Sequence, residues 1–152
     1  MKTITLENYR TDKYYPRIVA AITKIFERSN YVSPIQLFKE MGLLQDQDIE
    51  NWRRGHIPYL EMVIKCNLSG TGRILRILRM HGHDLNLRPS ITIYTRWGKG
   101  AKTRLQFSKS NTKNIEDAYS CHLLHVRGEK FKDTEDNIET DLISDSEKTP
   151  IL

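Results

Sequence analysis

The stretch that most constrains the fold is SPIQLFKEMGLLQDQDIENWRRGHIPYLE, at residues 33–61. Ser33 is a favoured helix cap and is followed by proline, which suits the first helical position. Gly42 favours the left-handed conformation that ends a helix, and Asp46 is a good cap for the next one. Gly55 then stops that second helix. The stretch therefore predicts two short helices joined by a tight turn.

Four further segments show apolar residues at helical spacing, which predicts a helix in each. The first begins at Pro16 and is ended by Ser29 and Asn30, and the second begins at Pro58. The third has Ser69 as its expected cap and places its apolar side chains on one face. The last is capped by Asn111 or Thr112, and its apolar stripe consists of Ile115, Ala118, Tyr119 and His122.

The hydrophobic period changes to two between about residues 91 and 108, as expected for strands. Apolar and polar residues alternate in ITIYTRW and again in LQF, with the segment Gly98–Gly100 between the two runs. Two alternating runs around a glycine-bearing loop predict a β-hairpin. One face of this hairpin must pack on the helices, because an isolated hairpin is marginally stable. The exposed face is expected to carry Tyr94, Arg96 and Arg104.

Charge divides the 152-residue chain into a basic body and an acidic end. Residues 129–152 carry eight acidic and three basic side chains, a net −5; the whole chain is +5, which leaves +10 on residues 1–128. The acidic end is also poor in aromatic residues, which is typical of disorder. We predict a flexible segment at 1–13, a single domain at 14–125 and a disordered acidic tail at 126–152. The expected fold class is α+β and mostly helical, with five or six short helices, one hairpin and a single core.

Several function classes find no support in the sequence. No apolar run approaches the roughly 18 residues that a membrane-spanning helix needs. The N-terminal MKTITLENYR has no apolar signal core and two cysteines make no disulfide framework, so a cytoplasmic protein is expected. No catalytic or phosphate-binding motif is present, so we expect neither an enzyme nor a cofactor. No metal is expected either, because the spacings of His81, His83, Cys121, His122 and His125 differ from those of structural zinc sites.

Two resemblances extend this interpretation. The segment FKEMGLLQDQDIENWRRGHIP resembles the core of repressor-type helix-turn-helix domains, although Gly42 and Trp52 are one residue further apart than is common there. The residues that carry the resemblance are Gly42, Ile49, Trp52, Arg54, Gly55 and Pro58. In such domains the second helix enters the major groove of DNA. The segments WRRGHIPYLE, LRPSITIY, LQFSKS and IEDAYSCH are similar to short bacterial proteins of uncharacterised function, which implies one domain and no particular activity.

The sequence thus favours nucleic-acid binding, to DNA in the first place, through the two-helix segment and a basic hairpin. Asp48 and Glu50 oppose it, because from the second helix they would face phosphates. Lys99 and Lys102 flank the hairpin tip, where they would hold phosphates without reading bases. The expected contact residues are Gln47, Asn51, Arg53, Arg54, Arg73, Arg76, Arg79, Arg96, Lys99, Lys102 and Arg104.

Two alternatives to nucleic-acid binding remain open from the sequence. The first is a non-enzymatic protein-interaction or adaptor module, in which the same helices are a scaffold. The second is a solvated surface without a polyanionic partner, because uneven charge serves solubility as much as binding. Neither the oligomeric state nor a protein partner follows from the sequence.

Overall fold

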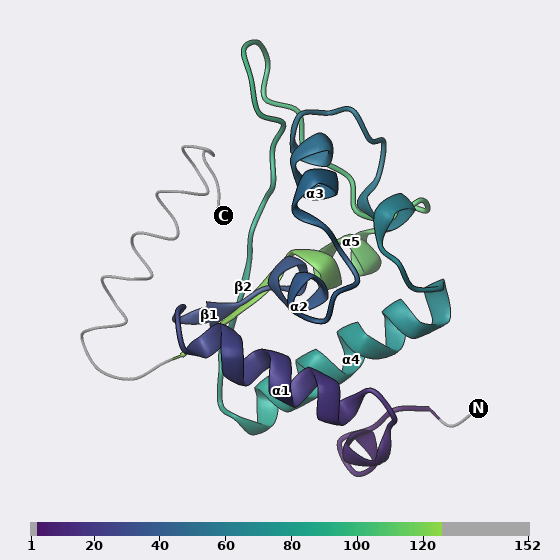
Figure 1. The fold of residues 1–152 in the computed structure, drawn as a ribbon, viewed down its shortest axis with the longest axis vertical. Helices are drawn as coiled ribbons and strands as arrows, with labels where there is room; N and C mark the ends of the chain where they lie inside the picture. Colours follow the sequence, from purple (N-terminus) through teal and green to yellow (C-terminus); the bar gives the residue numbers. More distant parts are fainter. Residues whose placement is uncertain (1–2, 126–152) are drawn as a thin grey trace.

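A computed structural model describes residues 3–125, and within this range the chain folds as a mostly helical α+β domain, which confirms the predicted fold class. Five α-helices and a small sheet form it (Figure 1). The helices are α1 (Tyr15–Phe26), α2 (Pro34–Glu40), α3 (Asp46–Arg53), α4 (Leu68–Asp84) and α5 (Lys113–Ser120), with short 3-10 turns η1 (Tyr9–Thr11) and η2 (Leu60–Val63). The strands are β1 (Tyr31–Val32), β2 (Arg88–Ile91) and β3 (Cys121–Leu124). The predicted acidic tail at 126–152 lies outside the described residues.

Residues at their own N-termini explain where α1, α2 and α4 begin, whereas α3 has no side-chain cap. Proline stands in the first turn of α1, and α2 starts with a complete capping box between Ser33 and Gln36. The Ser33 side chain accepts from the Gln36 N–H at 3.1 Å, and the Gln36 side chain accepts from the Ser33 N–H at 2.7 Å. Two predicted caps are wrong by one or two residues. Asn67 caps α4 in place of Ser69, and Gln45 precedes α3, with Asp46 already inside its first turn.

The helix predicted after Pro58 is reduced to the single turn η2. Two backbone N–H groups at its start form hydrogen bonds with residues that are distant in the sequence. The N–H of Leu60 donates to the carbonyl of Gln106 at 3.2 Å, and that of Glu61 donates to Phe107 at 2.9 Å. A helical segment would direct these donors along its own axis. The non-local bonds therefore replace the expected helix.

The sheet arises from segments that are far apart in the sequence. Strand β3 is central and antiparallel to both neighbours, in the order β1-β3-β2. His122, which was predicted on a helical stripe, instead lies in this central strand opposite Ser90 and is fully buried. α5 ends at Ser120, and the next residues form hydrogen bonds to strands on both sides. Strand pairing has thus overridden the local helical spacing.

The predicted hairpin at 91–108 is also corrected. Only one bridge, between Thr95 and Arg104, joins its two arms, and β2 pairs with β3. The phase of the first arm is opposite to the prediction, since Tyr94 is buried while Ile91 and Ile93 are exposed. The Tyr94 ring lies 5.7 Å from the Trp52 ring. Tyr94 faces inward because its ring packs on Trp52 and its hydroxyl is paired with His122 at 2.7 Å.

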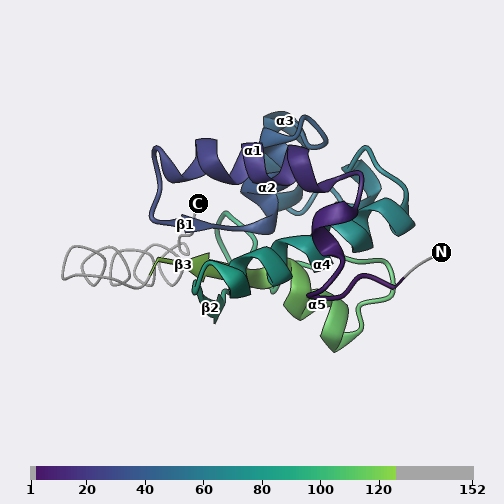
Figure 2. The same cartoon turned by 90° about the horizontal axis from the view of Figure 1, so that it is seen from below.

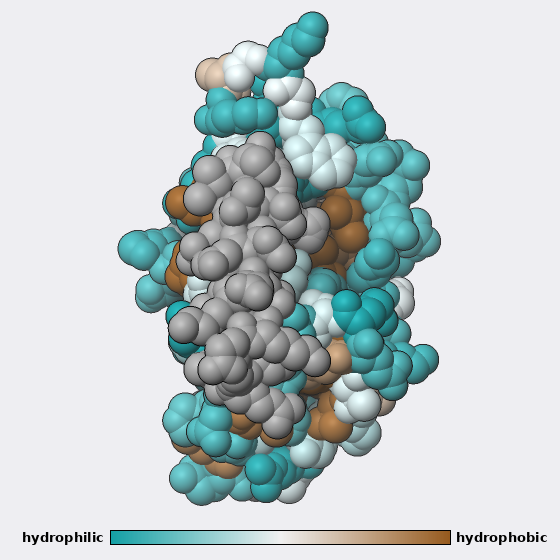
Figure 3. Space-filling model, turned by 90° about the vertical axis from the view of Figure 1, so that its left-hand side faces the viewer, coloured by the Kyte–Doolittle hydropathy of each residue, from teal (hydrophilic) through white to brown (hydrophobic). Residues whose placement is uncertain are grey.

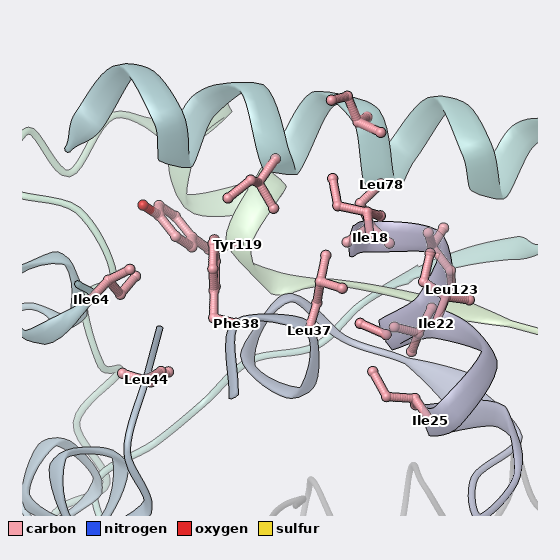
Figure 4. Close-up of a cluster of buried hydrophobic side chains, with 14 of the residues drawn as sticks. Ile18, Ile22, Ile25, Leu37, Phe38, Leu44, Ile64, Leu78, Tyr119 and Leu123 are labelled. Carbon is pink, nitrogen blue, oxygen red and sulfur yellow. The ribbon is translucent and has the colours of Figure 1, made fainter. Parts of the chain in front are cut away.

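A single hydrophobic core joins the helices to the sheet. α1 and α4 pack against each other, and Figure 2 shows α1 and α2 on one side of α4 with α5 on the other. Figure 4 shows Ile18 of α1, Leu78 of α4 and Leu123 of β3 converging in this core. Trp52 is fully buried as predicted, and its indole N–H donates to the carbonyl of Gln106 at 2.8 Å.

The segment 1–13, predicted to be flexible and outside the domain, is corrected for its described part, residues 3–13. Ile4 and Tyr9 are buried in the core, because this segment packs against α1. The Tyr9 hydroxyl donates to the carboxylate of Asp84 at 2.6 Å, at the end of α4. Asp12, also buried, forms an ion pair with Arg73 of α4. The domain therefore begins close to the N-terminus.

Candidate nucleic-acid interface

A projecting basic loop forms one end of the molecule, at the top of Figure 1. Gly98 and Gly100 have positive φ angles of 111° and 97°, which glycine adopts without strain and which turn the chain back sharply. Lys99 and Lys102 are exposed on this loop. Figure 3 shows that this end of the molecule is mostly hydrophilic. The predicted position of the two lysines at a loop tip therefore holds, although the arms are not a regular hairpin.

The loop is fastened to the C-terminal end of α3. The N–H of Trp97 donates to the carbonyl of Arg53 at 2.7 Å. The guanidinium of Arg53 lies 5.0 Å from the centre of the Trp97 ring and 5.3 Å from that of Tyr94. On the outer side, Arg96 covers Gly55 so closely that a Cβ there would lie 2.6 Å from its Cδ. The loop and the end of α3 consequently form one surface.

Four cations on this surface have no carboxylate within ion-pair distance among residues 3–125: Arg96, Lys99, Lys102 and Arg104. Two of them contact backbone carbonyls, since Arg96 donates to Lys99 at 3.5 Å and Lys102 donates to Gly98 at 3.3 Å. These long, exposed contacts leave the charges accessible to water. Unpaired cations on a shared surface are suited to bind an anion.

The exposed face of α3 continues this surface with polar side chains. Gln47 donates to Asn51 at 3.3 Å, one helical turn away, and Arg54 lies one turn further on the same face. Acidic residues that oppose nucleic-acid binding are partly neutralised. Asp46 pairs with Lys39 at 2.7 Å, and Glu50 contacts Arg54 at 3.9 Å. The face of α3 thus carries little uncompensated charge beyond Asp48.

Four of the predicted contact residues lie elsewhere. Arg53 is only 3% exposed, so it connects α3 to the loop and is not available at the surface. Arg73 is engaged with Asp12. Arg76 and Arg79 are exposed on α4, which lies well away from the loop tip in Figure 1. The predicted contact residues therefore fall into three groups. Some lie on the loop and α3, Arg53 and Arg73 make contacts within the protein, and Arg76 and Arg79 form a second basic region on α4.

Sequence reasoning missed a groove between α4 and α5. It has a volume of about 830 Å³ and is lined by apolar side chains of both helices, with Arg76 and Arg79 beside them. A smaller hollow of about 490 Å³ lies between the N-terminal segment and the start of α4. Leu68 and Ile115 are exposed beside this groove, although the sequence placed Ile115 on the apolar stripe of its helix and Leu68 before its helix, so it gave no signal of the groove. Such single exposed apolar residues are common and do not by themselves predict a groove.

Histidine and cysteine side chains do not gather in a metal centre. Within residues 3–125, no group of three or more His, Cys, Asp or Glu side chains could hold a metal ion. His122 is hydrogen-bonded through Nε2 to the Tyr94 hydroxyl at 2.7 Å and stacks on Tyr31 at 4.9 Å. Complete burial lowers its pKa from the ordinary 6.5 to about 3. The pKa of His81 is also lowered, first by burial and then by Arg10. Both are structural residues in this arrangement.

Comparison with known proteins adds no relative: no family model, curated protein or solved structure matches the chain. None of the helices within residues 3–125 has the length and apolar character needed to cross a membrane.

Proposed function

We propose that this protein binds nucleic acid, DNA in the first place, through the surface formed by the 96–104 loop and α3. The observation that carries the proposal is the set of four cations without carboxylate partners in the described chain, held on the end of α3. Phosphate oxygens are the ligands that such exposed guanidinium and ammonium groups bind in nucleic acids. The resemblance of the α2–α3 segment to repressor-type domains supports the same function. A cytoplasmic location belongs to this proposal, and the two free thiols, Cys66 and Cys121, are compatible with it.

In this arrangement the loop binds phosphates and orients the protein on the duplex, and side chains of α3 contact base edges. Lys99, Lys102 and Arg104 contact phosphates, whereas Gln47 and Asn51 lie on the exposed face of α3 and offer amides suited to adenine edges. Asp48 limits how closely α3 approaches the backbone, because its carboxylate would meet phosphates. Affinity should therefore come mainly from the loop.

The test compares two pairs of substitutions that remove the same charge. Lys99→Ala with Lys102→Ala removes two cations from the loop, and Arg76→Ala with Arg79→Ala removes two from α4. Each lost phosphate contact lowers the slope of log affinity against log salt by about 0.9. The loop pair should therefore flatten the slope by about 1.8 and weaken binding to all duplexes alike, while the α4 pair should leave the slope nearly unchanged.

Binding is measured by fluorescence anisotropy of a labelled random-sequence duplex over a series of salt concentrations. Equal effects of the two pairs would show that total charge, and not this surface, determines binding. The absence of duplex and single-strand binding at low salt would refute the function altogether and would favour the protein-interaction alternative.

A further inference from the structure

The groove between α4 and α5 has exposed apolar side chains on both of its walls. Leu68 is 67% exposed and Ile115 is 40% exposed, on opposite walls. Leu75, Ala118 and Leu123 line the space between them. A concave site that is lined mainly by apolar side chains with a few polar groups is the usual form of a binding site.

The α4 wall is a straight row of side chains. Leu68, Gly72, Leu75 and Arg79 follow one another at spacings of three and four residues, which places them along one face of the helix. From the first to the last, the row is about 16 Å long at 1.5 Å per residue. Gly72 leaves a gap in it, because a Cβ added there would have no atom within 4 Å. The groove is thus long enough for about three turns of another helix.

The edges of the groove are basic. Arg76, Arg79 and Lys109 line it, and none of them has a carboxylate partner among residues 3–125. Glu61 is the only acidic residue of the lining, and its carboxylate is already engaged. It accepts from the Tyr119 hydroxyl at 2.8 Å and from the N–H of Lys109 at 3.0 Å. A ligand that fits must therefore be apolar on one side and acidic along its flanks.

We propose that this groove binds an acidic amphipathic helix of a partner protein. Two helices form the long walls, and their backbone groups are already hydrogen-bonded within α4 and α5, so they offer no strand edge to an extended peptide. A helix satisfies its own backbone and lays its apolar face into such a groove. Leucine-like anchors enter beside Gly72 and Leu75, and flanking carboxylates reach the basic edges. The inference does not rest on nucleic-acid binding, since it uses other residues.

The probe is a synthetic fluorescent peptide of about 16 residues, with leucines at positions i, i+3, i+4 and i+7 and glutamates on both flanks. Its affinity for the full chain is measured by anisotropy. Gly72→Leu should fill the groove and weaken binding at least about tenfold, a change of about 1.4 kcal/mol. Gly72→Ala is the matched control, because a single methyl group occupies only the open space next to α4. It should change affinity less than about twofold.

Charge reversal tests the edges of the groove. A peptide with lysines in place of the glutamates should bind the wild type at least about tenfold more weakly, and the double variant R76E/R79E should reverse this preference. The reactivity of Cys121 reports whether the groove is occupied, because Cys121 lines the groove whereas Cys66 does not. Bound acidic peptide should slow the reaction of Cys121 with a thiol reagent and leave Cys66 unaffected.

Four results would overturn the proposal. The first is no binding of the acidic peptide to the wild type at about millimolar concentration, a free energy of about −4 kcal/mol. The second is equal binding to wild type and Gly72→Leu. The third is protection of neither cysteine. The fourth is self-association of the full chain that excludes the peptide, which would identify a second copy of the chain as the occupant. In each case the loop experiment on nucleic acid remains independent.

Discussion

The fully buried His122 makes a prediction about stability and pH that follows from its surroundings. Nε2 is paired with the Tyr94 hydroxyl, and Nδ1 has no hydrogen-bond partner among the described residues. Protonation would place a positive charge in the core and add a second N–H donor with nothing to receive it. This is why burial lowers the pKa of His122 from 6.5 to about 3 in the folded protein.

The sign of the effect follows from linkage between protonation and folding. Below pH 6.5 the unfolded chain binds a proton at this histidine and the folded protein does not, so acid favours unfolding. The stabilisation is fully present above pH 6.5 and is lost as the pH falls towards 3. Between pH 7 and pH 5 the free energy of unfolding should therefore fall by about 2 kcal/mol because of His122 alone. Carboxylates with lowered pKa values, such as that of Asp84, lose their contribution only at lower pH.

Urea denaturation at pH 7 and pH 5 measures this loss, and His122→Gln is the comparison, because glutamine keeps a polar group near Tyr94 but does not titrate. His81 also has a lowered pKa and should add to the loss in both proteins equally. The difference between wild type and variant isolates His122. Parallel losses of stability in the two proteins would refute the reasoning. So would imidazole NMR signals of folded His122 that titrate near pH 6.5.

Two further predictions concern the packing beneath the candidate surface. Trp52→Ala should lower the free energy of unfolding by roughly 3–5 kcal/mol in thermal or urea denaturation, because the buried indole packs on Phe107 and binds the Gln106 carbonyl; unchanged stability would contradict this. Glu116→Gln should cost about 1.5–3 kcal/mol, because the buried carboxylate accepts from the N–H groups of Phe107 and Ser108 and from the Ser108 hydroxyl. Wild-type stability of Glu116→Gln would show that these hydrogen bonds are replaceable. Asp117→Asn is the control, because this neighbouring carboxylate is only half-buried.

Local signals were sufficient where an element depends on its own residues. The proline in the first turn of α1, the capping box of α2 and the positive φ of 78° at Gly42 are all consequences of side chains within a few positions. The apolar periods of α1 and α4 also predicted which face is buried, because a 3.6-residue repeat is a property of the chain itself. Lys99 and Lys102 were placed at a loop tip by the glycines around them.

The tertiary structure decided everything that depends on partners distant in the sequence. Tyr94 faces inward because its ring packs on Trp52 and its hydroxyl is hydrogen-bonded to Nε2 of His122. β3 is a strand because β1 and β2 pair with it on both sides. Contacts with residues distant in the sequence also determined which of the predicted binding residues lie on the candidate surface. Arg53 entered the core between two aromatic rings, while residues of α4 and α5, more than thirty positions apart, came together as a groove. Charge and periodicity identify a residue's type of environment, but only packing determines its neighbours.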